Sequence, residues 1–96
     1  MIIKKKMTIE NPQGLHARPA SVFVKIANKF ESEVCVRKGS EAVNGKSIMG
    51  LLTLAANQGS MIEIEVSGVD AEQAMKELEN FIMSDKEEDT KKETRP

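Results

Sequence analysis

The sequence of 96 residues is poor in aromatic side chains and contains no tryptophan or tyrosine. Its aromatic content is 3%, supplied by three phenylalanines, so the core must be built mainly from aliphatic side chains. A protein that binds nucleic acid by stacking bases on aromatic rings is therefore not expected. The single cysteine excludes an intrachain disulfide bond, which fits a reducing compartment.

A large excess of one charge and long apolar runs are also missing. Fourteen basic and fifteen acidic residues give a formal net charge of -1, which indicates no basic face for nucleic acid. The apolar run at the start is too short for a signal peptide, and no segment approaches the roughly 18 apolar residues of a membrane span. We therefore expect a small cytoplasmic protein that inserts into no membrane.

Hydrophobic periodicity predicts a single α+β domain. Alternating apolar residues indicate strands, and apolar residues at helical spacing indicate helices. The expected elements are strands near 3–9, 33–37, 41–43 and 61–66, and helices near 17–29, 47–55 and 71–82. Because strands that bury one face favour antiparallel pairing, the order β–α–β–β–α–β–α predicts an open-faced β-sandwich, in which three helices cover one face of a four-stranded antiparallel sheet.

The domain is expected to span residues 1–83. Residues 84–96 include nine charged side chains and no apolar one, so burial cannot offset the entropy of ordering them. A disordered charged tail is therefore predicted for residues 84–96, and no role can be assigned to it from the sequence.

Four residues predict local features of this fold. Lys5 interrupts the apolar row of the first strand, which indicates a position near a sheet edge. Gly59 is available for a left-handed cap after the second helix. Asp70 is expected to cap the third helix, with Gln73 three residues on as in a variant capping box.

His16 is the only histidine and lies between a glycine-containing loop and the start of a helix. Pro19 fits the first helical turn, so the helix is expected to begin near Arg18, with His16 near its N-cap. An anion there would meet unpaired amides and the positive end of the helix dipole, and the Arg18 guanidinium suits phosphate oxygens. This setting suggests phosphoryl chemistry on His16, with an ordinary surface histidine as the alternative.

Ser47 stands at the expected start of the second helix. Its hydroxyl is a favourable N-cap, and a phosphate would be tolerated there because negative charge suits a helix N-terminus. The segment 40–47 ends in Gly-Lys-Ser with the spacing of a P-loop, but its first position is Ser40 instead of glycine. A P-loop also needs a larger parallel sheet, so a nucleotide-binding domain is the weaker hypothesis.

The helix after Ser47 carries apolar residues over about 220° of its circumference, more than a surface helix needs to bury. Leu51 and Leu54 fall on one side, and Ile48, Met49 and Leu52 fall on the neighbouring side. Either the helix is deeply packed, or the second group forms an exposed patch. We favour an exposed patch, which is typical of a partner-binding site.

Other polar residues offer little chemistry. Cys35 lies between two valines in a strand and is expected to be a half-buried hydrophobe, not a reactive thiol. Glu63 and Glu65 alternate along a strand and are expected on a solvated sheet face. One histidine and one cysteine give no metal-ligand spacing, so neither a metal nor another cofactor is predicted.

Two motifs resemble a known family. The segment Gly14-Leu15-His16-Ala17-Arg18-Pro19-Ala20 is similar to the signature of the histidine-containing phosphocarrier family, HPr, of the phosphoenolpyruvate-dependent sugar phosphotransferase system. The segment Val43-Asn44-Gly45-Lys46-Ser47-Ile48-Met49-Gly50-Leu51 resembles the regulatory-serine segment of the same family. The resemblance runs from about residue 3 to residue 83, and the tail departs from it.

This resemblance implies a phosphocarrier that is not itself an enzyme. His16 would accept a phosphoryl group on Nδ1 from enzyme I, with help from Arg18, and pass it to a sugar-specific enzyme IIA domain. Ser47 would be phosphorylated by an HPr kinase/phosphorylase, which slows transfer and creates a corepressor for a catabolite-control transcription regulator. Ile48, Met49 and Leu52 correspond to the docking patch of the family.

Two alternatives remain open within the resemblance. The chain could act mainly as a regulatory binding module through phosphorylated Ser47, or as the carrier of a nitrogen-regulatory branch. Nothing in the sequence demands more than a monomer, and the sequence identifies no particular sugar.

Overall fold

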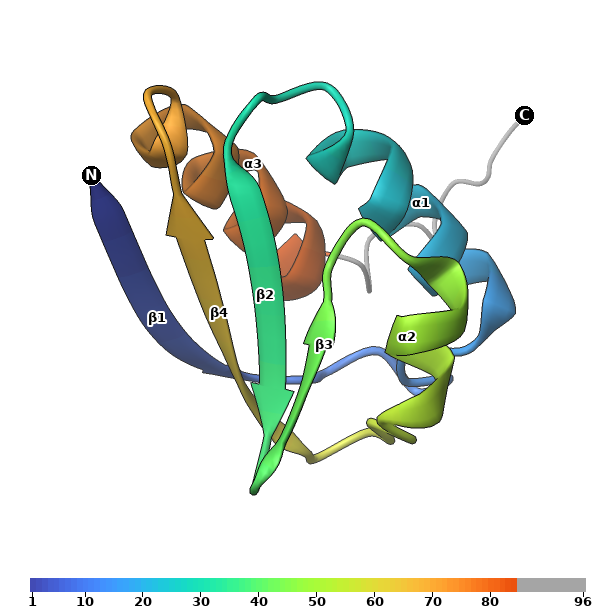
Figure 1. Ribbon diagram of the computed structural model, residues 1–96. Coiled ribbons are helices and arrows are strands. Elements are labelled where there is room, and N and C mark those ends of the chain that lie inside the picture. The colour runs from blue at the N-terminus through green and yellow to red at the C-terminus, as the bar shows by residue number, and fades with distance from the viewer. Residues whose placement is uncertain (85–96) are drawn as a thin grey trace.

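The computed structural model describes residues 1–84, except for the side chain of Ser84, and Figure 1 shows how the elements are arranged. The element order β–α–β–β–α–β–α is the one that periodicity predicts. The bounds are β1 Ile2–Thr8, α1 Ala17–Ala27, β2 Glu33–Lys38, β3 Glu41–Asn44, α2 Ile48–Thr53, β4 Met61–Ser67 and α3 Ala71–Ser84. The predicted charged tail lies outside the described residues, apart from Ser84.

The four strands form one sheet in the order β1-β4-β2-β3, and every neighbouring pair is antiparallel. All three helices lie on the same face of this sheet (Figure 1). Along β4, Ile62, Ile64 and Val66 are buried towards the helices, whereas Glu63 and Glu65 alternate with them. The predicted open-faced α+β sandwich is therefore confirmed.

The core between sheet and helices is aliphatic, as the scarcity of aromatic residues requires. Phe23 on α1 is its one fully buried aromatic side chain among the described residues. Leu51 from α2 and Leu78 from α3 are also fully buried, so each helix contributes to the same core. Complete burial of side chains of this size stabilises the fold by about 1.5–3 kcal/mol each.

Lys5 occupies the edge strand β1, as predicted, and points to the face that the helices cover. Its neighbours on that face are Ile3 and Met7, because side chains two residues apart share a face. The Lys5 Nζ lies 2.8 Å from the Glu79 Oε1 of α3. This ion pair explains how a charged side chain is accommodated among the apolar residues of β1 that face the helices. Because it is exposed, it stabilises the fold by no more than about 1 kcal/mol.

The end of α2 differs from the prediction. The helix stops at Thr53, and Ala55, not Gly59, adopts the left-handed conformation that follows it, with φ of 52°. The amide of Ala55 donates to the carbonyl of Leu52 in a tightened last turn. The Gly59 amide instead donates to the Ile9 carbonyl at 2.8 Å, so this glycine serves the turn before β4.

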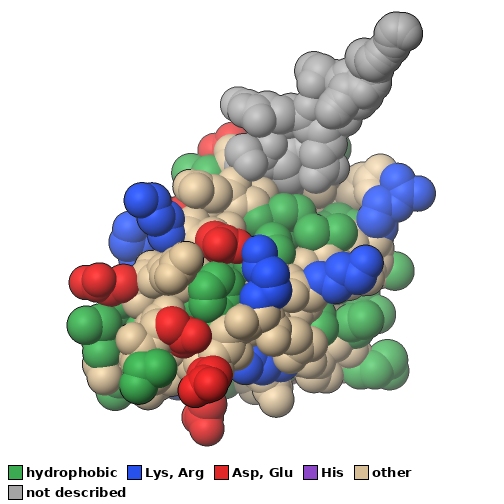
Figure 2. Space-filling view, turned by 90° about the horizontal axis from the view of Figure 1, so that it is seen from above, with side chains coloured by type: hydrophobic (Ala, Val, Ile, Leu, Met, Phe, Trp, Pro, Cys, Tyr) green, Lys and Arg blue, Asp and Glu red, His purple; other side chains and the backbone are tan. Residues whose placement is uncertain are grey.

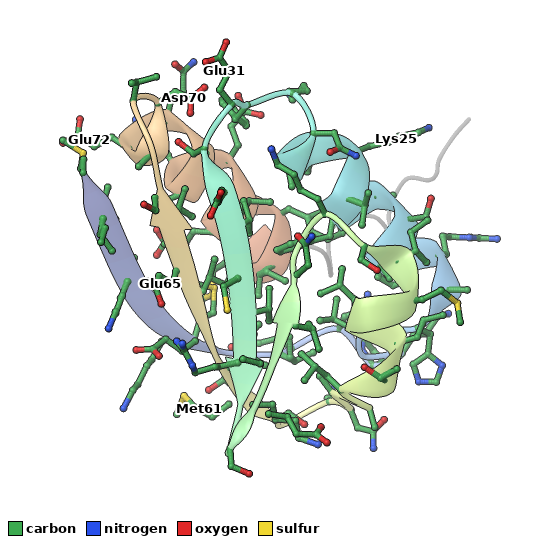
Figure 3. All side chains as sticks on the ribbon, in the orientation of Figure 1. Lys25, Glu31, Met61, Glu65, Asp70 and Glu72 are labelled. Carbon is green, nitrogen blue, oxygen red and sulfur yellow. The ribbon has the colours of Figure 1, made fainter. Side chains whose placement is uncertain are left out.

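Asp70 also differs from its predicted role. Its carbonyl accepts the first helical hydrogen bond of α3, from the Ala74 amide, so it does stand at the start of the helix. Its carboxylate, however, accepts hydrogen bonds from the amides of Glu31 and Ser32 and from the Ser32 hydroxyl. The predicted capping box with Gln73 is therefore wrong, because the loop between α1 and β2 occupies the carboxylate. Figure 3 shows Asp70 and Glu31 together at this end of the molecule.

Candidate functional site

His16 lies at the N-cap of α1, where the prediction placed it. Its backbone is extended, with φ of -86° and ψ of -168°, and its carbonyl accepts a hydrogen bond of 2.8 Å from the Ala20 amide. The imidazole makes no capping hydrogen bond and is exposed to solvent. The ring is therefore available to a molecule that approaches from outside.

The loop before His16 is held against the segment that follows α2. The Leu15 amide donates to the Ala56 carbonyl at 2.9 Å, and the Leu15 side chain is buried. Gly14 has φ of +67°, and a Cβ added to it would lie 2.5 Å from the Ala56 oxygen and 2.9 Å from the Asn57 Cα. Only glycine fits this close approach, so the backbone that carries His16 has a defined position.

The first turn of α1 favours an anion. The amides of Ala17 and Arg18 have no acceptor in the described part of the chain, and Pro19 has no amide hydrogen. No acidic residue lies in this turn, and the exposed Arg18 has no ion-pair partner among residues 1–84. Unpaired amides, the positive end of the helix dipole and a guanidinium thus occur at the same helix end.

A shallow hollow of about 280 Å³ opens beside His16. It brings Leu52 of α2 next to the histidine, although the two are far apart in the sequence. Sequence reasoning missed the residues after α2, because no local pattern there indicates which distant loop they contact. The hollow is lined by Leu15, His16, Ala17, Leu52, Ala55, Ala56 and Asn57.

Ser47 lies at the N-cap of α2, as predicted. Its hydroxyl oxygen accepts a hydrogen bond of 2.9 Å from the Gly50 amide, and its backbone is extended. The residue as a whole is half-buried. A phosphate added here would face the amides of the first turn.

The predicted surface of α2 is exposed. The exposed fractions are 40% for Ile48, 71% for Met49 and 36% for Leu52, and we call these three residues the α2 patch. Leu51 and Leu54 on the other side are buried. The alternative of a deeply packed helix is therefore wrong, and three apolar side chains remain for a partner to cover.

The other sequence candidates have structural partners. The Lys46 Nζ donates to the Phe30 carbonyl at 2.8 Å in an all-antiparallel sheet, so segment 40–47 is no P-loop. Arg37 lies 3.5 Å from Glu63 and 3.1 Å from Glu65. The hydrogen bond to Glu65 is the main cause that raises the pKa of Arg37, which keeps the guanidinium charged beside both carboxylates.

Cys35 is half-buried, as expected. Among the described residues, no group of three or more histidine, cysteine, aspartate or glutamate side chains could hold a metal ion. No helix within residues 1–84 is long and apolar enough to cross a bilayer. On the face seen in Figure 2, basic and acidic side chains are interspersed, with no continuous basic surface.

Comparison with known proteins gives consistent matches. Residues 3–84 match the family model described as the PTS HPr component phosphorylation site. The chain is 47% identical over 81 residues to the phosphocarrier protein HPr of Neisseria meningitidis serogroup A, covering 84% of this chain and 91% of that protein.

Two solved structures are also similar. The HPr of Bacillus anthracis has a TM-score of 0.82 and 41% identity, with 84% of this chain and 96% of that chain covered. Crh of Bacillus subtilis has a TM-score of 0.70 and 37% identity, with 84% of this chain and 93% of that chain covered. That Crh structure is described as a catabolite-repression protein that forms a dimer by domain swapping.

Proposed function

Because the chain belongs to the HPr family of the phosphotransferase system, we propose that His16 accepts a phosphoryl group from phosphorylated enzyme I and passes it to a sugar-specific enzyme IIA domain. The observation that carries this proposal is the exposed imidazole at the N-cap of α1. The same helix end carries unpaired amides and the exposed Arg18, which has no ion-pair partner among residues 1–84.

In the proposed transfer, the unprotonated Nδ1 of His16 supplies its electron pair to phosphorus. The new nitrogen–phosphorus bond forms as the bond between phosphorus and enzyme I breaks, and the electrons of that bond remain with enzyme I. The guanidinium of Arg18 and the first-turn amides stabilise the negative oxygens during the step. In the second transfer, an acceptor atom of the IIA domain bonds to phosphorus as the nitrogen–phosphorus bond breaks. The electrons of that bond return to Nδ1 of His16.

The chain itself is proposed to be a carrier and not an enzyme. The phosphoryl group stays on an exposed side chain, where the active sites of successive partners can reach it. The α2 patch adjoins the hollow beside His16 through Leu52, so a partner that covers the patch also reaches the histidine. An exposed apolar surface of this kind suits brief encounters of modest area. The proposed setting is the cytoplasm, and no cofactor takes part.

Incubation with enzyme I and phosphoenolpyruvate tests the proposal. We expect one acid-labile, alkali-stable phosphoryl group per chain, and we expect none in the variant His16→Ala. Equal labelling of His16→Ala would contradict the proposal. The matched control is Ser47→Ala, which keeps His16 and should be labelled like the unmodified chain.

A second proposed function is regulation through Ser47. Its support is the N-cap position, where added phosphate meets helix amides, together with the likeness to Crh, a catabolite-repression protein. An HPr kinase/phosphorylase would transfer a phosphoryl group from ATP to the hydroxyl oxygen, and the product would bind a catabolite-control transcription regulator. Mass spectrometry after treatment with purified kinase and ATP should find the modification on Ser47 and find none in Ser47→Ala.

We propose that the chain acts as a monomer. The exposed edge strand β1 carries Lys4, Lys5 and Lys6 in a row, and strands of like charge repel each other when they pair. Analytical ultracentrifugation should give the mass of one chain at micromolar concentration. A stable dimer would contradict this part of the proposal.

A further inference from the structure

Lys38 is the last residue of β2 and belongs to none of the motifs that the sequence analysis singled out. It shares a face with Val34 and Val36, because side chains two residues apart in a strand point the same way. Both valines are buried under the helices. The alternation therefore directs Lys38 to the covered face, at the point where the sheet meets the end of α2.

The ammonium group of Lys38 donates hydrogen bonds to the backbone at the C-terminal end of α2. Its Nζ donates to the carbonyl of Leu54 at 3.2 Å and to the carbonyl of Ala55 at 3.1 Å. Carbonyls at a helix end lack intrahelical donors, and a cation there also meets the negative end of the dipole. Lys38 thus fixes the turn in which Ala55 holds φ of 52°, a conformation that alanine rarely adopts.

The turn held by Lys38 leads directly to the support of His16. The next carbonyl along the chain, that of Ala56, accepts the hydrogen bond from the Leu15 amide. Ala55 and Ala56 also line the hollow beside the imidazole. Two consecutive sets of hydrogen bonds therefore connect the end of β2 to the residue before His16.

We propose that Lys38 is a positioning residue for phosphoryl transfer at His16. It acts through the carbonyls of Leu54 and Ala55, which place Ala56 to hold the Leu15 amide. This inference rests on the proposed function of His16. Lys38 itself donates no hydrogen bond to the phosphoryl group and takes no part in making or breaking bonds to phosphorus.

The test compares Lys38→Met with Lys38→Arg. Methionine keeps an apolar stem and removes the donor, whereas arginine keeps donors that can reach the two carbonyls. The matched control is Lys46→Met, which also removes a lysine hydrogen bond to a backbone carbonyl. That carbonyl belongs to Phe30, which lies beyond the far end of α1. The eleven residues of this helix separate it from His16 by about 16 Å along the helix axis.

Amide hydrogen exchange distinguishes positioning from general destabilisation. In Lys38→Met, exchange of the Leu15 amide should accelerate roughly tenfold more than exchange of the Ala74 amide at the start of α3. The ring resonances of His16 should shift in nitrogen-15 NMR spectra. In Lys46→Met the two amides should change equally, and the ring resonances should remain in place. Lys38→Arg should restore both signals.

Transfer kinetics complete the test. In Lys38→Met, kcat for phosphorylation by enzyme I should fall about three- to tenfold, because misplaced reacting atoms slow transfer. The KM should change little, since the α2 patch is unaltered.

Equal acceleration of amide exchange at Leu15 and Ala74, with unchanged His16 ring resonances, would overturn the inference. If the unmodified chain accepts no phosphoryl group, the proposed function fails, and the NMR signals still decide the role of Lys38. Lys38→Gln replaces Lys38→Met if the latter does not fold.

Discussion

Replacing Gly14 by alanine should reveal how tightly the loop before His16 is held. The backbone at Gly14 has φ of +67°, and an added Cβ would lie 2.5 Å from the Ala56 oxygen and 2.9 Å from the Asn57 Cα. The left-handed conformation costs a residue with a Cβ about 1–2 kcal/mol. Because both close atoms belong to the backbone, the contact must open, and loss of the Leu15–Ala56 hydrogen bond costs about 0.5–1.5 kcal/mol more.

Gly39 supplies the matched control for this substitution. It has φ of +61°, but an added Cβ would meet nothing within 4 Å. Gly39→Ala should therefore cost only the conformational part, about 1–2 kcal/mol, while Gly14→Ala should cost about 1.5–3.5 kcal/mol.

Urea unfolding measures both variants, and phosphorylation by enzyme I gives the second comparison. Gly14→Ala should slow transfer to His16, because its loop moves away from Ala56, whereas Gly39→Ala should transfer normally. Equal losses of stability in the two variants, or normal transfer in Gly14→Ala, would refute the close-approach argument.

Three further predictions concern the surroundings of the site. Ala55→Gly should raise the free energy of unfolding by about 0.5–1 kcal/mol, because glycine adopts a positive φ without strain, and urea unfolding would show this. The Ser32 hydroxyl and the amides of Glu31 and Ser32 hold the pKa of Asp70 below its usual value. Its contribution to stability is therefore complete above the unfolded-state pKa of about 3.9 and is lost as the pH falls through the lower folded-state pKa. When the pH is lowered and unfolding is followed by circular dichroism, Asp70→Asn should lack the loss of stability that protonation of Asp70 causes in the unmodified chain. Met49→Glu should raise the KM for enzyme I severalfold and change the free energy of unfolding by less than about 0.5 kcal/mol, since the side chain is exposed. An unchanged KM would show that enzyme I does not cover the α2 patch.

Features with a local cause could be predicted from the sequence. The strand alternation and helical spacing indicate all seven elements, because burial of one face determines both patterns. His16 and Ser47 were both expected at helix starts, since Pro19 marks a first turn and serine is a favourable N-cap. The exposed α2 patch followed from an excess of apolar residues over what one helix face can bury.

Features that depend on contacts between distant segments could not be predicted. Asp70 has the local pattern of a cap, but its carboxylate binds a loop almost forty residues earlier in the chain. Gly59 has the usual identity of a helix terminator, yet Ala55 takes the left-handed conformation. Lys38 carries no local signal at all, because its role arises only when β2 meets the end of α2.

Phosphorus NMR after treatment with enzyme I and phosphoenolpyruvate tests the central claim most directly, because it reports both the type of residue and the ring nitrogen that carries the phosphate. We expect one phosphohistidine resonance, bonded through Nδ1, that is absent in His16→Ala and present in Ser47→Ala. A resonance from a phosphorylated residue other than histidine, or a phosphohistidine bonded through Nε2, would contradict this prediction, as would an unmodified chain that remains unphosphorylated beside an active enzyme I.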